Sequence, residues 1–218
     1  MRIQHVIFDL DGTLVDSAPG ILASLRVALE SVGLAAAVPL ERGLIGPPLT
    51  EIVQTLLPHA DAETRTLAIE GFKTHYDSIG VLGSVPYDGI DECLDQLRST
   101  GIQLWIATNK RRAPTSRLMH EFGWSSIFEG VYSLDSFCPP KMSKAELLEQ
   151  VLQVRAIDRR GATYIGDRTE DEEAAAMCGL HFLKACWGYG NLSFAKSDAA
   201  VDARQIPELI RKRQRSGV

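Results

Sequence analysis

The sequence predicts an α/β fold, in which a parallel sheet forms one part of the molecule and a helical lobe is inserted into it. From residue 84 onward, short apolar runs alternate with helical patterns, which is typical of βαβ units and a parallel sheet. Residues 17 to about 82 show helical patterns instead. Residues 1–16 carry one strand pattern without a helix of their own, so we expect this strand to join the sheet built by residues 84–218.

The first strand is expected at residues 6–10, where an apolar run ends in Asp11-Gly12-Thr13. A short apolar run that enters a turn pattern is typical of a buried strand. The lobe then begins with a helix whose apolar residues recur every three to four positions and which Gly33 should end. Prolines separate it from two further helices. The three helices are expected at residues 21–32, 52–57 and 67–76.

Beyond the lobe, strand and helix patterns alternate. The clearest helix carries Ile90, Cys93, Leu94 and Leu97 on one face, and Gly101 should end it. The remaining elements are read from apolar runs and from apolar residues at helical spacing. Strands are expected at residues 104–108, 131–132, 162–165 and 181–185, and helices at about 113–122, 147–152, 170–178 and 206–214.

Composition and charge exclude several classes of protein. Lys and Arg number 23 against 28 Asp and Glu, and a net charge of −5 lacks the basic excess of duplex-binding proteins, so we expect no nucleic-acid partner. The four cysteines form no C-x-x-C pair, which argues against a zinc knuckle or a dithiol redox site and suits a reducing cytosol. Without a signal-peptide pattern or a membrane-spanning apolar window, the sequence predicts a cytoplasmic protein with no membrane partner.

Polar side chains gather where three predicted strands end, and ligands of open parallel sheets bind beyond these carboxyl ends. Neighbouring carboxylates repel one another unless a cation lies between them or one keeps a proton, and Mg²⁺ prefers such oxygen ligands. A carboxylate can attack phosphorus, and a second carboxyl can protonate the leaving oxygen. Each fragment alone is an ordinary turn pattern, but their order favours a shared catalytic edge. The side chains are Asp9, Asp11, Thr108, Asn109, Lys110, Asp167 and Asp171.

Four motifs make the chain resemble the haloacid-dehalogenase-like hydrolase superfamily, in particular its phosphoglycolate-phosphatase-like branch. They are Asp9-x-Asp11-Gly12-Thr13-Leu14-Val15-Asp16-Ser17, Thr108 after an apolar strand, a lysine at 141 or 144, and Gly166-Asp167-x-x-x-Asp171 followed by Ala174, Ala175 and Gly179. Trp187-Gly188-Tyr189-Gly190 is similar to a segment of the same branch. The resemblance implies a Rossmann-like parallel-sheet core of residues 1–16 and 84–218, with residues 17–83 as an inserted all-α cap domain.

The resemblance also implies a role for each motif residue. Asp9 would be the nucleophile that becomes phosphorylated and a metal ligand, and Asp11 would be the general acid and base, with its backbone carbonyl on Mg²⁺. Asp167 would bind the metal directly, and Asp171 directly or through water. The third-motif lysine would offset the charge between Asp9 and the phosphate. The residues that would hold the phosphoryl group are Thr108, Asn109, Leu10 and Gly12.

Two lysines compete for the third motif. Ser143-x-x-Glu146 is a capping-box pattern that places Lys144 at the first helical position, where a cation opposes the helix dipole at a small cost that a catalytic role would explain. The separation between Lys144 and Asp167 is also similar to that of one branch of the family. We therefore prefer Lys144 and keep Lys141 as the runner-up near the phosphate.

These features lead us to expect a Mg²⁺-dependent phosphatase whose partner is a small phosphorylated metabolite, with a phosphoglycolate-like substrate first. The family's dehalogenases and phosphonate-cleaving members lack an aspartate at the position of Asp11. The alternatives are a sugar phosphomutase resembling β-phosphoglucomutase, a 5′-nucleotidase or a pyrophosphatase, and last a non-catalytic binding protein. We expect a monomer or a weak dimer.

Several basic residues are expected to be ordinary surface charges. Residues 110–112 have the pattern of an exposed helix start, and the side chain of Arg168 is expected to point to solvent. The alternative for these residues is attraction of an anionic substrate, and for Arg168 also a weaker binding of the metal. Gly46-Pro47-Pro48-Leu49 predicts a rigid turn that presents a specificity loop to the active edge. Three cap cations are expected at the surface by default, with contact to a second anionic group of the substrate as the alternative. They are Arg26, Arg42 and Arg65.

Overall fold

A six-stranded parallel sheet organises the computed structural model, which describes residues 3–190 and 198–216. The strand order is β5-β4-β1-β6-β7-β8, and every neighbouring pair is parallel. The prediction of a parallel α/β sheet is confirmed, although β8 was not expected. The strands are β1 (His5–Phe8), β4 (Gln103–Thr108), β5 (Gly130–Ser133), β6 (Ala162–Gly166), β7 (His181–Ala185) and β8 (Asp198–Ala200).

Strand β1 lies at the centre of the sheet, between β4 and β6. Its residues Val6, Ile7 and Phe8 are fully buried, as expected for a strand covered on both faces. In the register of the sheet, Phe8 lies opposite both Ile106 and Ile165. The three central strands therefore end close to the same level, so the residues that follow them are neighbours in space.

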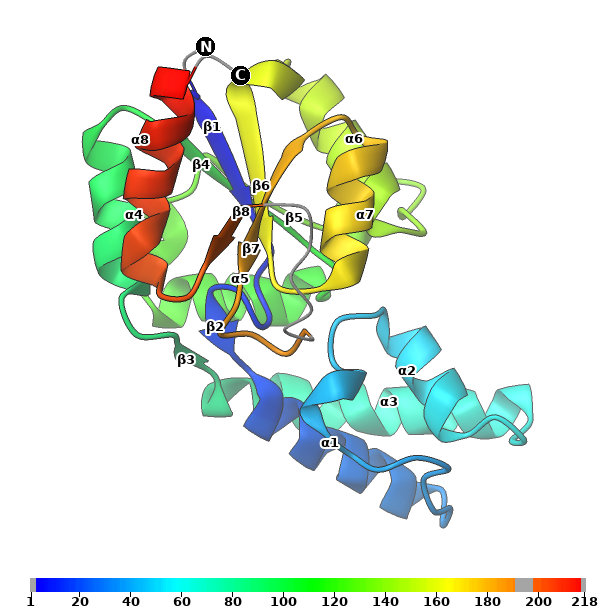
Figure 1. Ribbon diagram of the computed structural model, residues 1–218. Coiled ribbons are helices and arrows are strands. Elements are labelled where there is room, and N and C mark those ends of the chain that lie inside the picture. Colours follow the sequence, from blue (N-terminus) through cyan, green and yellow to red (C-terminus); the bar gives the residue numbers. More distant parts are fainter. Residues whose placement is uncertain (1–2, 191–197, 217–218) are drawn as a thin grey trace.

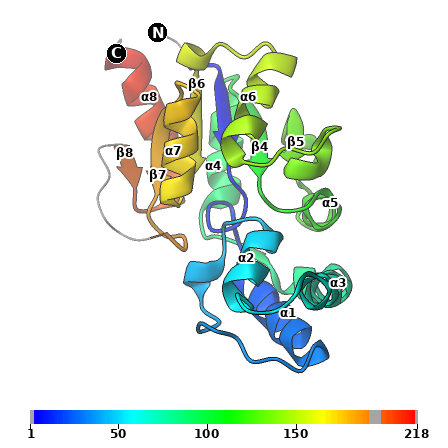
Figure 2. The same cartoon turned by 90° about the vertical axis from the view of Figure 1, so that its right-hand side faces the viewer.

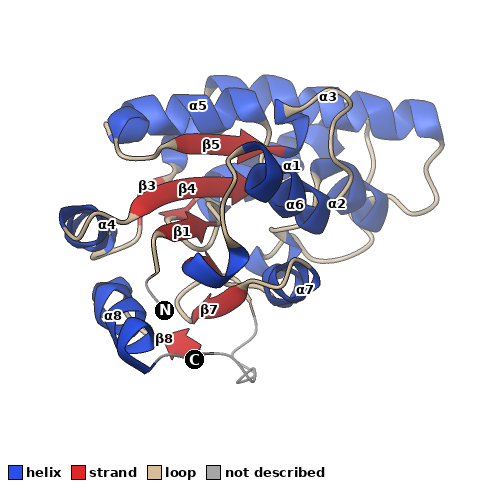
Figure 3. Cartoon of the chain, turned by 90° about the horizontal axis from the view of Figure 1, so that it is seen from above, coloured by secondary structure: helices blue, strands red, loops and turns tan. Residues whose placement is uncertain are grey.

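Helices cover both faces of the sheet (Figures 1 and 3). Alternate residues of β1 point to opposite faces, so Val6 and Phe8 belong to one buried cluster and Ile7 to the other. The apolar face predicted around Cys93 and Leu97 is buried. On the face of Val6 and Phe8 lie α4 (Ile90–Ser99), α5 (Arg112–Glu121) and α8 (Ile206–Ser216), and on the other lie α6 (Lys144–Val154) and α7 (Thr169–Met177).

A separate group of helices lies beyond the carboxyl ends of the strands (Figures 1 and 2). Within residues 17–83, all of which the structure describes, the regular elements are helical, as predicted. They are α1 (Ala18–Ser31), η1 (Arg42–Leu44), α2 (Leu49–Leu56), α3 (Ala62–Ser78) and η2 (Gly80–Gly83). We call residues 17–83 the cap and the rest the core; this division remains a prediction.

Two chain segments connect the cap with the core. They pair as a short antiparallel sheet of β2 (Val15–Asp16) and β3 (Val85–Pro86). The remaining 3₁₀ helices lie in the core and are η3 (Trp124–Ser126), η4 (Leu134–Ser136), η5 (Arg159–Gly161) and η6 (Ala203–Gln205). Among the helices that the structure describes, none combines the length and the apolar character needed to cross a membrane.

Candidate active site

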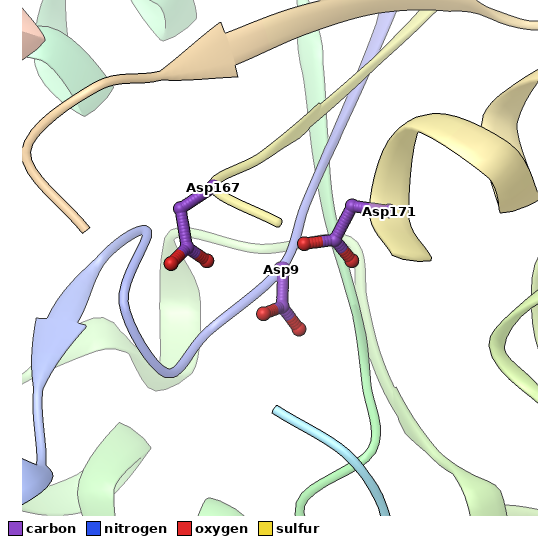
Figure 4. A group of neighbouring side chains, drawn as sticks. All are labelled: Asp9, Asp167 and Asp171. Atoms are coloured by element: carbon purple, nitrogen blue, oxygen red, sulfur yellow. The ribbon is translucent and has the colours of Figure 1, made fainter. Parts of the chain in front are cut away.

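Three buried carboxylates meet where the central strands end. Asp9 is the first residue beyond β1, Asp167 is the first beyond β6, and Asp171 lies in the first turn of α7. Their carboxylate groups point into a common space (Figure 4), and ligand oxygens of all three lie within 4.8 Å of one another. None of the three is more than 5% exposed. The register of the sheet thus brings Asp9 together with two aspartates that follow it by more than 150 residues.

The burial of these carboxylates opposes their ionisation. Burial raises the pKa of Asp9 to about 6, with Lys144 acting in the opposite direction and Asp171 adding to the rise. Burial, together with the charges of Asp171 and Asp9, raises the pKa of Asp167 to about 7. A hard divalent cation among these oxygens would relieve the repulsion and the loss of hydration. The donor set of Asp9, Asp167 and Asp171 therefore fits Mg²⁺.

Lys144 provides a buried positive charge beside this cluster. Its Nζ lies 2.6 Å from Asp9 Oδ1 and 3.1 Å from Asp171 Oδ1, and it donates to the Tyr164 hydroxyl at 3.1 Å. Burial opposes the charge, but the two carboxylates outweigh it and raise the pKa of Lys144 above its usual value. Ser143 caps α6 by accepting from the Glu146 amide, so Lys144 begins the helix, as expected.

Of the two candidate lysines, the structure brings Lys144 into contact with Asp9. Lys141 lies elsewhere, with its Nζ 5.7 Å from the centre of the Phe137 ring. The contact with Asp9 also explains how a cation is tolerated at a helix N-terminus. The attraction of Lys144 to two carboxylates outweighs its weak repulsion by the helix dipole.

Asp11 faces a second lysine rather than the three-carboxylate cluster. Lys110 Nζ lies 3.0 and 3.2 Å from the two Asp11 oxygens and donates to the hydroxyl of Tyr76, a residue of α3 in the cap, at 2.5 Å. Ser17 Oγ donates to Asp11 Oδ1 at 2.5 Å. The expectation that Lys110 is an exposed helix-start residue is wrong. Its side chain turns inward because a carboxylate and a hydroxyl are both within reach.

Sequence reasoning named Lys110 among the side chains at the strand ends but expected it to be exposed, and it missed Tyr76 as part of the site. Lys110 follows Thr108 by two positions at the end of β4, and that placement was the available signal. Tyr76 had no such signal, because it is one of several apolar positions on α3 and its neighbourhood depends on how the cap sits on the core. Ser17 stands inside the first motif, so its position there was the clue to its contact with Asp11.

Of the other residues expected at the phosphate, two border the space beside Asp9, and Leu10 and Gly12 shape the turn that follows it. Thr108 is buried, and with Asn109 it lines the cavity beside Asp9. The carbonyl of Leu10 accepts the backbone amides of residues 13–15, which closes a tight turn. Gly12 has φ of +90°, and a Cβ there would lie 2.6 Å from Asp167 Oδ2, so this position requires glycine.

The segment around Tyr189 holds Asp167 in place. The backbone amides of Tyr189 and Gly190 donate to Asp167 Oδ2 at 2.6 and 3.1 Å, and Thr13 Oγ1 donates to Oδ1 at 3.3 Å. The Tyr189 hydroxyl accepts from the Ser17 amide at 2.7 Å. The motif of residues 187–190 thus joins a site carboxylate to the entrance of the cap.

Arg168 connects the core with the cap, so the expectation that its side chain points to solvent is wrong. Its guanidinium donates to the carbonyl of Ile45 and, at 3.3 Å, to that of Gly43. Asn109 Nδ2 donates to the carbonyl of Gly46 at 2.8 Å. Two core residues next to the site therefore hold the cap loop of residues 43–46 through backbone carbonyls, which a sequence does not display.

A cavity lies between this loop, the cap helices and Asp9. The three cap cations considered from the sequence are not among the described residues that line it. Arg42 pairs with Asp16 at 2.9 Å, Arg65 donates to the carbonyl of Leu57 at 2.9 Å, and Arg26 is exposed. Gly46 and Pro47 do line the cavity, so the predicted turn reaches the site.

Comparisons with known proteins agree with this arrangement. The family model for "Haloacid dehalogenase-like hydrolase" matches residues 6–185. Tyrosine-protein kinase PtkA of Mycobacterium tuberculosis is 34% identical over 219 residues, covering 99% of this chain and 73% of the relative. A phosphoglycolate phosphatase of Xylella fastidiosa is 31% identical over 192 residues, covering 85% and 81%.

Solved structures share the fold over almost the whole chain. A structure described as a predicted phosphatase from Clostridium acetobutylicum has a TM-score of 0.85 at 26% identity, covering 99% of this chain and 100% of the other. The structure of Mycobacterium tuberculosis PtkA has a TM-score of 0.78 at 31% identity, covering 96% and 98%.

Proposed function

The chain belongs to the haloacid dehalogenase-like hydrolase family, and on that premise we propose that it hydrolyses a small phosphomonoester with Mg²⁺ through a phosphorylated Asp9. Its enzyme class is that of the phosphatases of this family. The observation that carries the proposal is the contact of Lys144 Nζ with Asp9 Oδ1 at 2.6 Å, beside the buried carboxylates of Asp167 and Asp171.

The reaction has two steps. An oxygen of Asp9 attacks phosphorus while the bond from phosphorus to the leaving oxygen breaks, and Asp11 gives its proton to that oxygen. Asp11 then takes a proton from a water molecule that attacks the phosphoaspartate, which releases phosphate and restores Asp9. Asp9, Asp167 and Asp171 would hold Mg²⁺, which supplies positive charge to the phosphoryl oxygens when bound.

Lys144 and Lys110 have different functions in the proposed reaction. Lys144 offsets the negative charge that Asp9 and the phosphoryl group bring together. Lys110 contacts the two carboxylate oxygens of Asp11 at 3.0 and 3.2 Å and so orients this group for both proton transfers. Since Lys110 also binds Tyr76 of the cap, the position of Asp11 depends on the cap lying against the core.

Phosphoglycolate is the first substrate to examine, because relatives named phosphoglycolate phosphatase are 29–31% identical to the chain. A second candidate activity is phosphoryl transfer to a tyrosine hydroxyl. It is favoured by the 34% identity to a tyrosine-protein kinase over 99% of the chain. Both activities would begin with transfer of a phosphoryl group from a phosphorylated donor to Asp9, with release of the rest of the donor. They would differ in the second acceptor, which is water in one case and a tyrosine hydroxyl in the other.

The test is phosphate release by the purified chain from phosphoglycolate, sugar phosphates, nucleoside monophosphates, pyrophosphate and p-nitrophenyl phosphate, with Mg²⁺ and with EDTA. We expect release that requires Mg²⁺ and that falls by about three orders of magnitude or more in Asp9→Asn. If the Asp9→Asn protein were as active as the wild type, Asp9 could not be the nucleophile. Isomerised sugar phosphate with little free phosphate would identify a mutase instead.

A further inference from the structure

The cavity beside Asp9 has an apolar wall on its cap side. Its floor is formed by Asp9 and Thr108 of the core, and its other side is lined by residues of the cap. The cap helices lie beyond the carboxyl ends of the strands (Figure 1). The wall is built from α1, α2, α3 and the loop after η1, so it does not depend on one element. Its apolar side chains are Ile21, Ile45, Leu49, Ile52 and Phe72.

This wall is preformed rather than a loose surface. Ile21, Ile45, Ile52 and Phe72 are each between 2% and 7% exposed, although they border a cavity. The Phe72 ring stacks on Tyr76, with ring centres 5.2 Å apart and an angle of 15° between the planes. The cavity leaves about 70 Å³ of free space beside this wall and is open on one side, so a leaving group can extend from the wall toward the mouth.

The cations that border this cavity already have partners. Lys110 is paired with Asp11, and Arg111 holds both oxygens of Asp77 at 2.5 and 2.9 Å. A second anionic group on the substrate would lose hydration here without finding an unpaired cation among the described lining residues. Such burial of an uncompensated charge is strongly unfavourable.

The second opening to Asp9 does not provide a place for such a group either. It runs along the start of α6 and α7, and its described lining includes three glutamates. Arg168, which also lines it, is bound to carbonyls of the cap loop and to Glu170 at 3.3 Å. Lys144 is paired with Asp9. The glutamates are Glu51, Glu170 and Glu173.

We propose that the substrate is a phosphomonoester whose leaving group is uncharged and apolar, with the phosphoryl group at Asp9 and the leaving group against the wall of the cap. This inference rests on the proposed function, because it takes Asp9 to be the nucleophile. The protein should then prefer alkyl or arylalkyl phosphates to substrates that carry a second anionic group, such as phosphoglycolate. The alcohol product leaves through the mouth of the same cavity.

The test compares kcat/KM for butyl phosphate, phenethyl phosphate and phosphoglycolate, which are all esters of primary alcohols. We expect kcat/KM for the two uncharged esters to exceed that for phosphoglycolate by about tenfold or more, since even one methylene group in an apolar pocket discriminates by about 10–200-fold. A value for phosphoglycolate equal to or above theirs overturns this inference and leaves the proposed function standing. Absence of phosphate release from all three and from p-nitrophenyl phosphate overturns both.

Substitutions at two neighbouring residues test whether the apolar wall of the cap causes this substrate preference. Leu49→Arg places a cation in the half-buried edge of the cavity, whereas Thr50→Arg places it on the exposed side of the same first turn of α2. We expect Leu49→Arg to shift the ratio of kcat/KM values toward phosphoglycolate by about tenfold, and Thr50→Arg to leave the ratio unchanged. Equal ratios in both variants and the wild type would show that the wall does not select the substrate.

A second variant keeps the test valid if Leu49→Arg fails to fold. Ile52→Ala removes apolar surface without adding charge, and we expect it to lower kcat/KM for phenethyl phosphate by about tenfold while that for phosphoglycolate changes by less than about twofold. A uniform loss for both esters would overturn the assignment of Ile52 to the leaving-group site.

Discussion

Lys144 is the residue on which the charge balance of the three-carboxylate cluster depends. It is buried, and it contacts Asp9 and Asp171 directly. In the proposed reaction, a phosphoryl group at Asp9 adds further negative charge, so we expect the lysine to matter more in the reacting complex than in the free protein. A residue of this kind contributes to the rate rather than only to the fold.

Lys144→Met is therefore expected to lower kcat/KM by about 10²–10³-fold. The matched variant Lys141→Met removes a lysine that lies against the Phe137 ring, and we expect it to change kcat/KM by less than about twofold. Steady-state kinetics with p-nitrophenyl phosphate measure both. Comparable losses in the two variants would mean that Lys144 has been assigned wrongly.

Asp9 and Asp167 make the stability of the metal-free protein depend on pH. Burial raises their pKa values to about 6 and about 7, against 3.8 for an ordinary aspartate. At pH values between 3.8 and about 7, these two carboxyl groups hold protons in the folded chain that they release in the unfolded chain. Stability from these groups is thus gained as the pH falls from about 8 toward 4, and lost as the pH rises through about 6 to 7.

Thermal unfolding tests this dependence. In EDTA, Asp167→Asn is expected to reduce the gain in Tm that the wild type shows between about pH 8 and about pH 5.5. Mg²⁺ is expected to raise the wild-type Tm more at the higher pH, because at the lower pH it must displace protons. An identical Mg²⁺ shift at both pH values would refute the coupling.

At the scale of elements, the cap loop of residues 43–46 borders the cavity beside Asp9. Arg168 and Asn109 hold it through backbone carbonyls. Gly46 has φ of +133°, and a Cβ there would collide with the Arg168 side chain. Gly43, by contrast, has nothing within 4 Å of an added Cβ. The contact with Arg168 thus depends on one glycine and not on the other.

We expect Gly46→Ala to lower the free energy of unfolding by about 1–3 kcal/mol, because alanine is strained in that backbone conformation. It should also lower kcat/KM, since the loop then loses its contact with Arg168. Gly43→Ala should leave both quantities near their wild-type values. Denaturant unfolding and kinetics of the two variants measure this, and a wild-type-like Gly46→Ala would exclude a role for the contact.

The same elements show how far the sequence predicts the structure. The spacing of Cys93 and Leu97 predicted the buried face of α4, and the apolar run before Asp9 predicted the central strand. Strand β8 was not predicted, because three residues of low hydrophobicity at the edge of a sheet carry no such pattern. Lys110 and Arg168 were placed wrongly, because their partners come from segments that only the tertiary structure brings close.

On the scale of the whole molecule, the proposed reaction places the reacting groups in the core and the leaving group against the cap. Carboxylates at strand ends were predictable, because parallel strands deliver their carboxyl ends to one edge. The cap side chains around the cavity were not, since their apolar character is shared with the interior of the cap. Tyr76 connects the two parts by binding Lys110, which in turn binds Asp11.

The most direct test of this account is the chemical nature of the phosphorylated enzyme. The chain is mixed with radiolabelled p-nitrophenyl phosphate and Mg²⁺, quenched in acid during turnover, and the label is located by peptide mapping. We predict a label on Asp9 that hydroxylamine removes and that is missing in Asp9→Asn. An active protein without any label, or with a hydroxylamine-resistant label at another residue in its place, would contradict the central role of Asp9.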